Sequence, residues 1–117
     1  MRRLALLACL VGFALTIAGA RAADFVPGTE DVPLMPGLAS VEGSSLVFDK
    51  PEGRIVESAA HGAVSRYDVT RFYAQSLPPL GWRRVGTATS WRREGEKLRL
   101  DFRGTDGDLT VGFSLSP

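Results

Sequence analysis

The stretch from residue 97 to residue 115 alternates apolar and polar side chains with a period of two, and this feature constrains the fold most strongly. The alternation occupies residues 97–103 and 109–115, and Asp106-Gly107 between them is a pair typical of tight hairpin turns. Successive side chains of a strand point to opposite faces, so one face here is apolar and the other polar. The pattern predicts an antiparallel sheet with one covered face and one face in water.

A single segment has the periodicity of a helix. Ser65, with Asp68 three residues later, matches a capping box. An apolar stripe at helical spacing follows, made of Val69, Phe72, Tyr73, Leu77 and Leu80. Pro78-Pro79 ends the helix because neither proline has an N–H to donate. We expect Leu80 to lie just past the helix and to seal its end.

Shorter strands are predicted at residues 46–48, 54–60, 82–85 and 90–94, and the first two are joined by a Lys50–Gly53 turn. The element order is then β-β-α-β-β-β-β. We expect residues 46–117 to form an α+β domain of two layers, with one amphipathic helix packed on an antiparallel sheet of about five or six strands.

The first 22 residues have the pattern of a secretory signal peptide. A basic start at Arg2-Arg3 precedes an apolar run, and Ala20-Arg21-Ala22 matches a cleavage site, with the cut expected after Ala22. The alternatives are a permanent anchor or lipidation of Cys9. The use of twelve Arg and two Lys favours a GC-rich bacterial genome. We therefore expect a periplasmic protein with no stable membrane span after cleavage.

Residues 23–45 are rich in proline and glycine and have no periodic pattern, which predicts an extended arm. The arm contains a compact apolar motif from Val32 to Leu38. The favoured interpretation is that this motif packs on the domain's own core. The alternative is a partner-binding ligand of the extended proline-rich kind, whose candidate binding residues are Pro33, Leu34, Met35 and Pro36.

Several chemistries have no residues to support them. Cys9 is the only cysteine and leaves with the signal peptide, and His61 is the only histidine, so no typical transition-metal site is expected. We predict no catalytic residues and no cofactor, since no nucleophile elbow or phosphate loop occurs. Three of the 14 basic residues precede Ala22, so 11 basic residues face 13 acidic ones in the mature chain. That acidic balance disfavours nucleic acid as a partner.

Two tryptophans lie beside arginine doublets, Arg83-Arg84 and Arg92-Arg93. Trp82, Trp91 and Arg92 are candidate binding residues for an anionic ligand. The favoured interpretation is structural: each doublet splits between the two faces of its strand. Glu94, Glu96 and Asp101 are then close enough in sequence to neutralise the arginines across strands.

Several segments together carry a resemblance. They are residues 31–38 (DVPLMPGL), 47–49 (VFD) and 53–55 (GRI), and above all Phe72-Tyr73 with Leu77-Pro78 and Leu80-Gly81-Trp82. The chain resembles a family of small uncharacterised secreted proteins of proteobacteria. The resemblance covers nearly all of the mature chain. It implies an exported α+β domain and brings no activity or catalytic residue with it.

These observations predict a non-enzymatic periplasmic protein, a small interaction module for an envelope partner. The alternative is a carrier or sensor of a small amphiphilic or anionic ligand. An enzyme is the least expected class because no catalytic set is present. A carrier needs a cavity of roughly 300 Å³ or more, whereas an interaction module can be solid.

Overall fold

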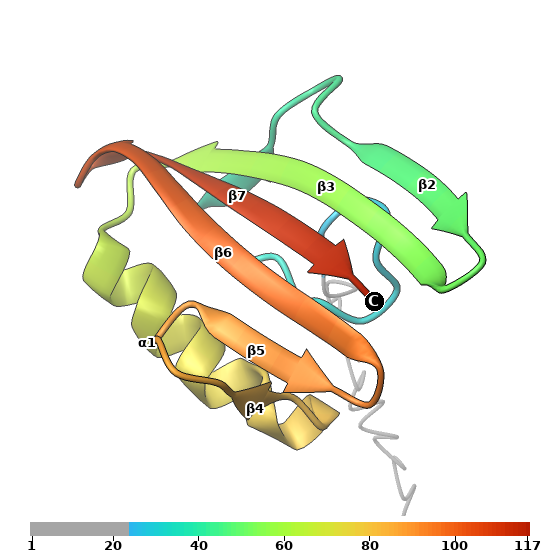
Figure 1. Cartoon of the computed structure of the whole chain (residues 1–117). Coiled ribbons are helices and arrows are strands. Elements are labelled where there is room, and N and C mark those ends of the chain that lie inside the picture. The colour runs from blue at the N-terminus through green and yellow to red at the C-terminus, as the bar shows by residue number, and fades with distance from the viewer. Residues whose placement is uncertain (1–23) are drawn as a thin grey trace, which may run out of the picture.

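A computed structural model describes residues 24–117, so the expected signal peptide and its cleavage site lie outside the described residues. One antiparallel sheet contains all the strands, and one α-helix lies against it (Figure 1). The elements in chain order are β1 (Leu38–Ser40), β2 (Leu46–Lys50), β3 (Gly53–Gly62), α1 (Arg66–Ser76), a 3₁₀ turn (Pro78–Leu80), β4 (Arg83–Arg84), β5 (Ser90–Arg93), β6 (Glu96–Thr105) and β7 (Asp108–Ser116). The α+β class is confirmed.

The sheet has seven strands, where the sequence predicted about five or six. The order across the sheet is β4, β5, β6, β7 and β3, and both β1 and β2 pair with the remaining edge of β3. The strand that the sequence missed is β1, which has only three residues and follows the Pro36-Gly37 turn.

β1 and β2 are two pieces of one edge strand, interrupted at residues 41–45. Leu38 lies opposite Gly62 and Leu46 lies opposite Glu57. At the interruption the Ser44 hydroxyl accepts a hydrogen bond from the Ala59 amide (3.1 Å), which replaces a missing backbone partner. The two chains also approach closely at the start of β1, because a Cβ on Gly62 would lie 2.0 Å from the Gly37 carbonyl oxygen.

Helix α1 begins and ends as the sequence predicts. The Ser65 hydroxyl accepts from the Asp68 amide (3.0 Å) and the Asp68 carboxylate accepts from the Ser65 amide (3.4 Å), so the capping box is formed. The helix ends at Ser76, before the two prolines. Leu77 is fully buried and closes the end of the helix, whereas Leu80, predicted for that role, is 40% exposed.

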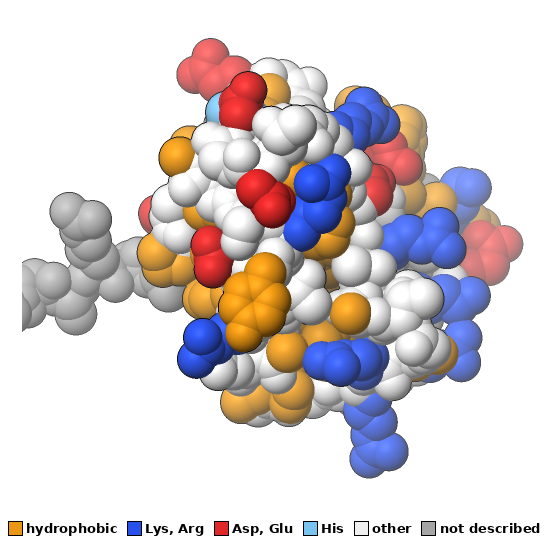
Figure 2. Space-filling model, turned by 90° about the vertical axis from the view of Figure 1, so that its left-hand side faces the viewer, with side chains coloured by type: hydrophobic (Ala, Val, Ile, Leu, Met, Phe, Trp, Pro, Cys, Tyr) orange, Lys and Arg blue, Asp and Glu red, His pale blue; other side chains and the backbone are white. Residues whose placement is uncertain are grey.

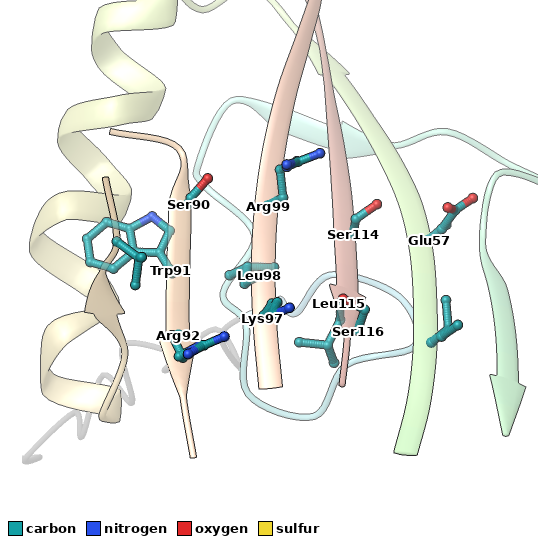
Figure 3. Close-up of a pocket in the computed structure, with 12 residues that line it drawn as sticks. Glu57, Ser90, Trp91, Arg92, Lys97, Leu98, Arg99, Ser114, Leu115 and Ser116 are labelled. Carbon is teal, nitrogen blue, oxygen red and sulfur yellow. The ribbon is translucent and has the colours of Figure 1, made fainter. Parts of the chain in front are cut away.

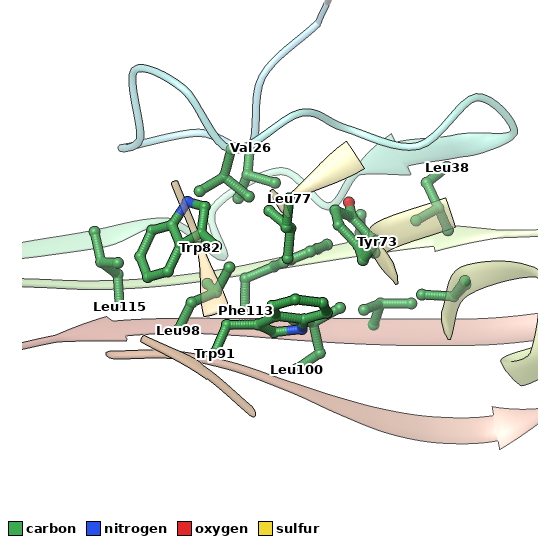
Figure 4. Packing of buried hydrophobic residues seen from close by; sticks show 14 of the residues in the cluster. Val26, Leu38, Tyr73, Leu77, Trp82, Trp91, Leu98, Leu100, Phe113 and Leu115 are labelled. Atoms are coloured by element: carbon green, nitrogen blue, oxygen red, sulfur yellow. The ribbon is translucent and has the colours of Figure 1, made fainter. Parts of the chain in front are cut away.

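The inner face of the sheet is covered by α1 and also by the segment 24–37, which the sequence predicted to be part of an extended arm. The segment doubles back on itself: the Val26 amide donates to the Val32 carbonyl (2.9 Å), and both valines are buried in the core. The Tyr73 hydroxyl of α1 donates to the Pro33 carbonyl (2.8 Å). Burial raises the pKa of this phenol. Figure 4 shows Tyr73, Leu77 and Trp82 in the layer between this segment and the sheet.

The strands β6 and β7 separate the two faces as their alternation predicted. The side chains that face α1 and the segment 24–37 are buried, and they are Leu98, Leu100, Leu109, Val111, Phe113 and Leu115. Lys97, Arg99, Asp101 and Arg103 lie on the opposite, outer face and are exposed. That outer face is therefore the part of the sheet that is available to other molecules.

Candidate functional site

A row of basic side chains crosses the outer face of the sheet. Arg83 of β4 lies opposite Arg92 of β5, and Arg92 lies opposite Lys97 of β6. Residues directly opposite on neighbouring strands point to the same side, with Cβ atoms roughly 5 Å apart, and like charges in such pairs repel each other. Arg99 adds a further positive charge two residues along β6, in the next row. All four side chains are exposed.

No carboxylate of residues 24–117 forms an ion pair with these four side chains. The ion pairs of the described residues are Arg66–Asp106 and Arg93–Asp31, and His61 lies within hydrogen-bonding distance of Asp108. Glu94, Glu96 and Asp101, which the sequence suggested would neutralise the arginines, form no ion pair with Arg83 or Arg92. Glu96 lies opposite Arg93 instead, and the charges of Glu96 and Glu94 contribute to the raised pKa of Arg93. The nearest acid in register with Arg99 is Glu57, and Ser114 of β7 separates the two.

The basic row borders a hollow on the outer face. Its volume is about 510 Å³, and it is an open trough rather than an enclosed cavity. Figure 3 shows its labelled side chains on β5, β6, β7 and β3. Besides Arg92, Lys97 and Arg99, the residues that line the trough are Ile55, Glu57, Val85, Ser90, Trp91, Leu98, Ser114, Leu115 and Ser116. The side chains of Trp91, Leu98 and Leu115 are buried on the inner side of the sheet.

The arginine doublets split between the faces, as the period of a strand requires. Arg92 points outward, and Arg93 points to the inner side, where its guanidinium donates to the Asp31 carboxylate and to the Leu80 carbonyl (3.2 Å). It also lies 4.3 Å from the centre of the Trp82 ring. The hydrogen bond with Asp31 raises the pKa of Arg93. Arg93 thus ties β5 to the segment 24–37 and is a structural residue.

The candidate residues named from the sequence are not brought together. Trp82 and Trp91 are 2% and 3% exposed, so their indoles pack in the core and do not share the outer face with Arg92. Pro33, Leu34 and Met35 are half-buried on the inner side, and Pro36 is exposed beside them. The sequence drew attention to the doublet that contains Arg83, but it did not identify Lys97 and Arg99 as binding residues. The strand alternation of the sequence predicts that these side chains share one face of the sheet. The register between the strands is also needed to show that they lie beside Arg92.

His61 is the only histidine of the chain, and histidine is the side chain most often used as a general acid or base. Its Nε2 lies 2.5 Å from Oδ1 of Asp108, and both side chains are exposed. Among residues 24–117, no hydroxyl is hydrogen-bonded to this imidazole. The same residues contain no group of three or more His, Cys, Asp or Glu arranged to hold a metal ion.

The chain was compared with protein families, curated proteins and solved structures. No protein-family model, no curated protein and no solved structure matches the chain. Within residues 24–117, none of the helical structure is long and apolar enough to cross a membrane.

Proposed function

We propose that this protein is a non-enzymatic binding module of the periplasm that recognises an anionic component of the cell envelope with the outer face of its sheet. The observation that carries the proposal is the row of Arg83, Arg92 and Lys97, which repel one another and have no carboxylate partner among the described residues. Local rules of stability are broken most often at functional sites. An anion from outside the chain would relieve this repulsion.

The side chains around the trough suit an oxyanion. An arginine guanidinium presents a planar fork of donors that matches a phosphate or carboxylate, and a lysine ammonium adds a compact positive charge. The hydroxyls of Ser90, Ser114 and Ser116 supply further donors. Glu57 repels anions from the β3 side, which directs an anion toward Arg92, Lys97 and Arg99.

The geometry argues against catalysis at this trough. His61 is level with Thr110 and Arg103, and Arg103 lies six residues along β6 from Lys97. At about 3.4 Å per residue that separation is about 20 Å, too far for proton transfer to a ligand at the basic row. The buried indoles also offer no surface on which nucleic-acid bases could stack.

A carrier that encloses its ligand is less well supported. The space between α1 and the sheet is filled by buried side chains that include Tyr73, Trp82, Trp91 and Phe113. The trough exceeds the roughly 300 Å³ that a small-molecule site needs, but it is open along the sheet. Recognition at a surface fits this shape better than transport inside a cavity.

The test is titration of the exported protein with pyrophosphate, followed by amide chemical shifts and calorimetry at several salt concentrations. We expect shifts at Arg92, Lys97 and Arg99, and binding that weakens with salt. Arg92→Gln with Lys97→Gln should reduce affinity about 10-fold or more, since charge-assisted hydrogen bonds contribute about 1.5–3 kcal/mol each.

The matched control is Arg54→Gln with Arg71→Gln, which removes the same charge away from the outer face. Arg54 is exposed on the inner-facing side of β3 and Arg71 is exposed on α1. We expect the control to bind within about 2-fold of the unmodified protein. Equal losses in the two double variants, or shifts confined to other surfaces, would contradict the proposal.

A further inference from the structure

The outer face also carries apolar side chains, at both ends of the basic row. Phe48 of β2 lies opposite Ile55 of β3, and Leu46 lies opposite Glu57, so these apolar residues share the outer face with Glu57. Phe48 is 55% exposed and Leu46 is 50% exposed. At the other end Val85 follows β4, is 50% exposed, and lines the trough.

The apolar and basic residues form one transverse strip. Val56 of β3 lies opposite Leu115 of β7, so the preceding residue, Ile55, is level with Ser116. Ser116 in turn lies opposite Lys97 of β6. The strip thus runs from Phe48 through Ile55 and Ser116 to Lys97, Arg92 and Arg83. It crosses six neighbouring strands, a width of about 24 Å at about 4.8 Å per strand.

We infer that this outer face docks flat on a bilayer containing anionic phospholipids, with Arg83, Arg92, Lys97 and Arg99 on lipid phosphates and Phe48 and Leu46 inserted at the boundary of headgroups and acyl chains. The inference rests on the proposed function and names the anionic component. Its basis is charge complementarity joined to exposed apolar side chains on the same face, the combination by which proteins bind anionic lipid surfaces.

A bilayer meets two requirements of this strip at once. A single small anion reaches only the basic residues around the trough and leaves Phe48 and Leu46 in water. A lipid surface presents phosphates over the whole width and an apolar layer directly beneath them. Figure 2 shows Lys and Arg side chains gathered toward the right of the view, the side on which the outer face of the sheet lies.

The first experiment measures binding of the exported protein, its N-terminus verified by mass spectrometry, to vesicles. We expect binding to vesicles of phosphatidylcholine with phosphatidylglycerol, and little binding to phosphatidylcholine alone. Arg92→Gln with Lys97→Gln should lower the affinity about 30-fold, taking about 5-fold for each cation near an anionic surface. Leu46→Ser with Phe48→Ser should lower it about 10-fold or more.

The control for the apolar pair is Tyr67→Ser with Leu80→Ser. Tyr67 on α1 is 70% exposed and Leu80 is 40% exposed, and neither belongs to the sheet. This variant removes two exposed apolar side chains elsewhere, so its vesicle binding should be unchanged. Thermal melting of all variants checks that each one is folded, which their exposed positions favour.

Tryptophan fluorescence can measure whether the side chain at position 48 inserts into the bilayer. The native tryptophans are both buried, so Phe48→Trp adds a single exposed indole to the outer face. On anionic vesicles its emission should shift to shorter wavelength and be quenched by brominated lipids, whereas Tyr67→Trp should show neither change.

The outcomes separate the two proposals. Pyrophosphate binding at the basic row without vesicle binding would overturn the docking and leave the proposed function standing. Absence of both would overturn both. Vesicle binding that the outer-face variants leave unchanged, or that the Tyr67 and Leu80 control abolishes, would also overturn the docking.

Discussion

The inner and outer faces of the sheet differ in how their arginines are paired, and β5 shows the difference in adjacent residues. Arg93 on the inner side has a carboxylate from Asp31, a carbonyl from Leu80 and the ring of Trp82. Arg92 on the outer side lies between Arg83 and Lys97 and has no ion-pair partner among residues 24–117. The same residue type is therefore structural on one face and free to bind an external anion on the other.

The apolar residues differ in the same way. On the inner side, Val26 and Val32 of the segment 24–37 are covered by the core. On the outer side, Leu46 and Phe48 are about half exposed. Burial gives the inner residues a large role in stability, and exposure leaves the outer residues free for binding. Stability and binding should therefore respond to separate sets of substitutions.

The largest expected effect is at the centre of the inner side. Tyr73→Ala should lower the free energy of unfolding by about 3–5 kcal/mol, because it empties a buried aromatic position and removes the hydrogen bond to Pro33. Phe72, which has the central place on the helical stripe in sequence, is only half-buried, so Phe72→Ala should cost less. Urea unfolding measures both, and equal losses would contradict the assignment of Tyr73 to the core.

A smaller effect is expected in the segment 24–37. Leu34→Ser with Met35→Ser should lower the free energy of unfolding by about 2 kcal/mol, since each side chain is half-buried against the core. The outer pair, Leu46→Ser with Phe48→Ser, should change it by less than about 0.5 kcal/mol. Thermal melting of the two double variants tests the contrast. A stable Leu34/Met35 variant would support a partner-binding role for this segment.

The two neighbouring arginines provide the next comparison. Arg93→Gln should cost about 1–2 kcal/mol through the lost hydrogen bonds and the contact with Trp82. Arg92→Gln should stay within about 0.5 kcal/mol of the unmodified protein. Denaturant unfolding at low and high salt measures both. If Arg92→Gln proves the more destabilising, the assignment of the two faces is wrong.

Alkaline pH should lower stability through the buried Tyr73 of the inner side. Burial raises the pKa of Tyr73 in the folded state above its ordinary value of 10.0, so the unfolded chain loses this proton first. Stability is then fully present below pH 10 and falls as the pH rises above it, by about 1 kcal/mol near pH 11. Tyr73→Phe should remove this part of the pH dependence. The control variant Tyr67→Phe, which removes an exposed phenol, should keep the same loss of stability at alkaline pH.

The smallest expected change in the free energy of unfolding comes from the basic residues of the outer face. Arg92→Gln with Lys97→Gln should leave the free energy of unfolding unchanged or raise it by up to about 0.5 kcal/mol, because it relieves repulsion between opposed positive charges. The same variant should lose anion binding. Melting compared with pyrophosphate titration measures the two properties, and a clear loss of stability would show that these cations are structural.

Local patterns in the sequence were sufficient for α1 and for the longer strands, although not for the three-residue β1. The capping box at Ser65 and the stop at Pro78 define α1, and the alternation around Asp106-Gly107 defines the β6–β7 hairpin. These features depend on residues close together in the chain, where backbone geometry determines which side chains share a face. The same alternation already separated Arg92 from Arg93.

Only the tertiary structure decided which side chains from different elements lie together. The segment 24–37 has no periodic pattern, and its place on the core depends on distant partners such as Tyr73 and Arg93. The basic row needs the register of three strands, and its continuation to Phe48 needs the order of six. Register and order follow from the burial of apolar side chains far apart in the sequence, so no local pattern contains them.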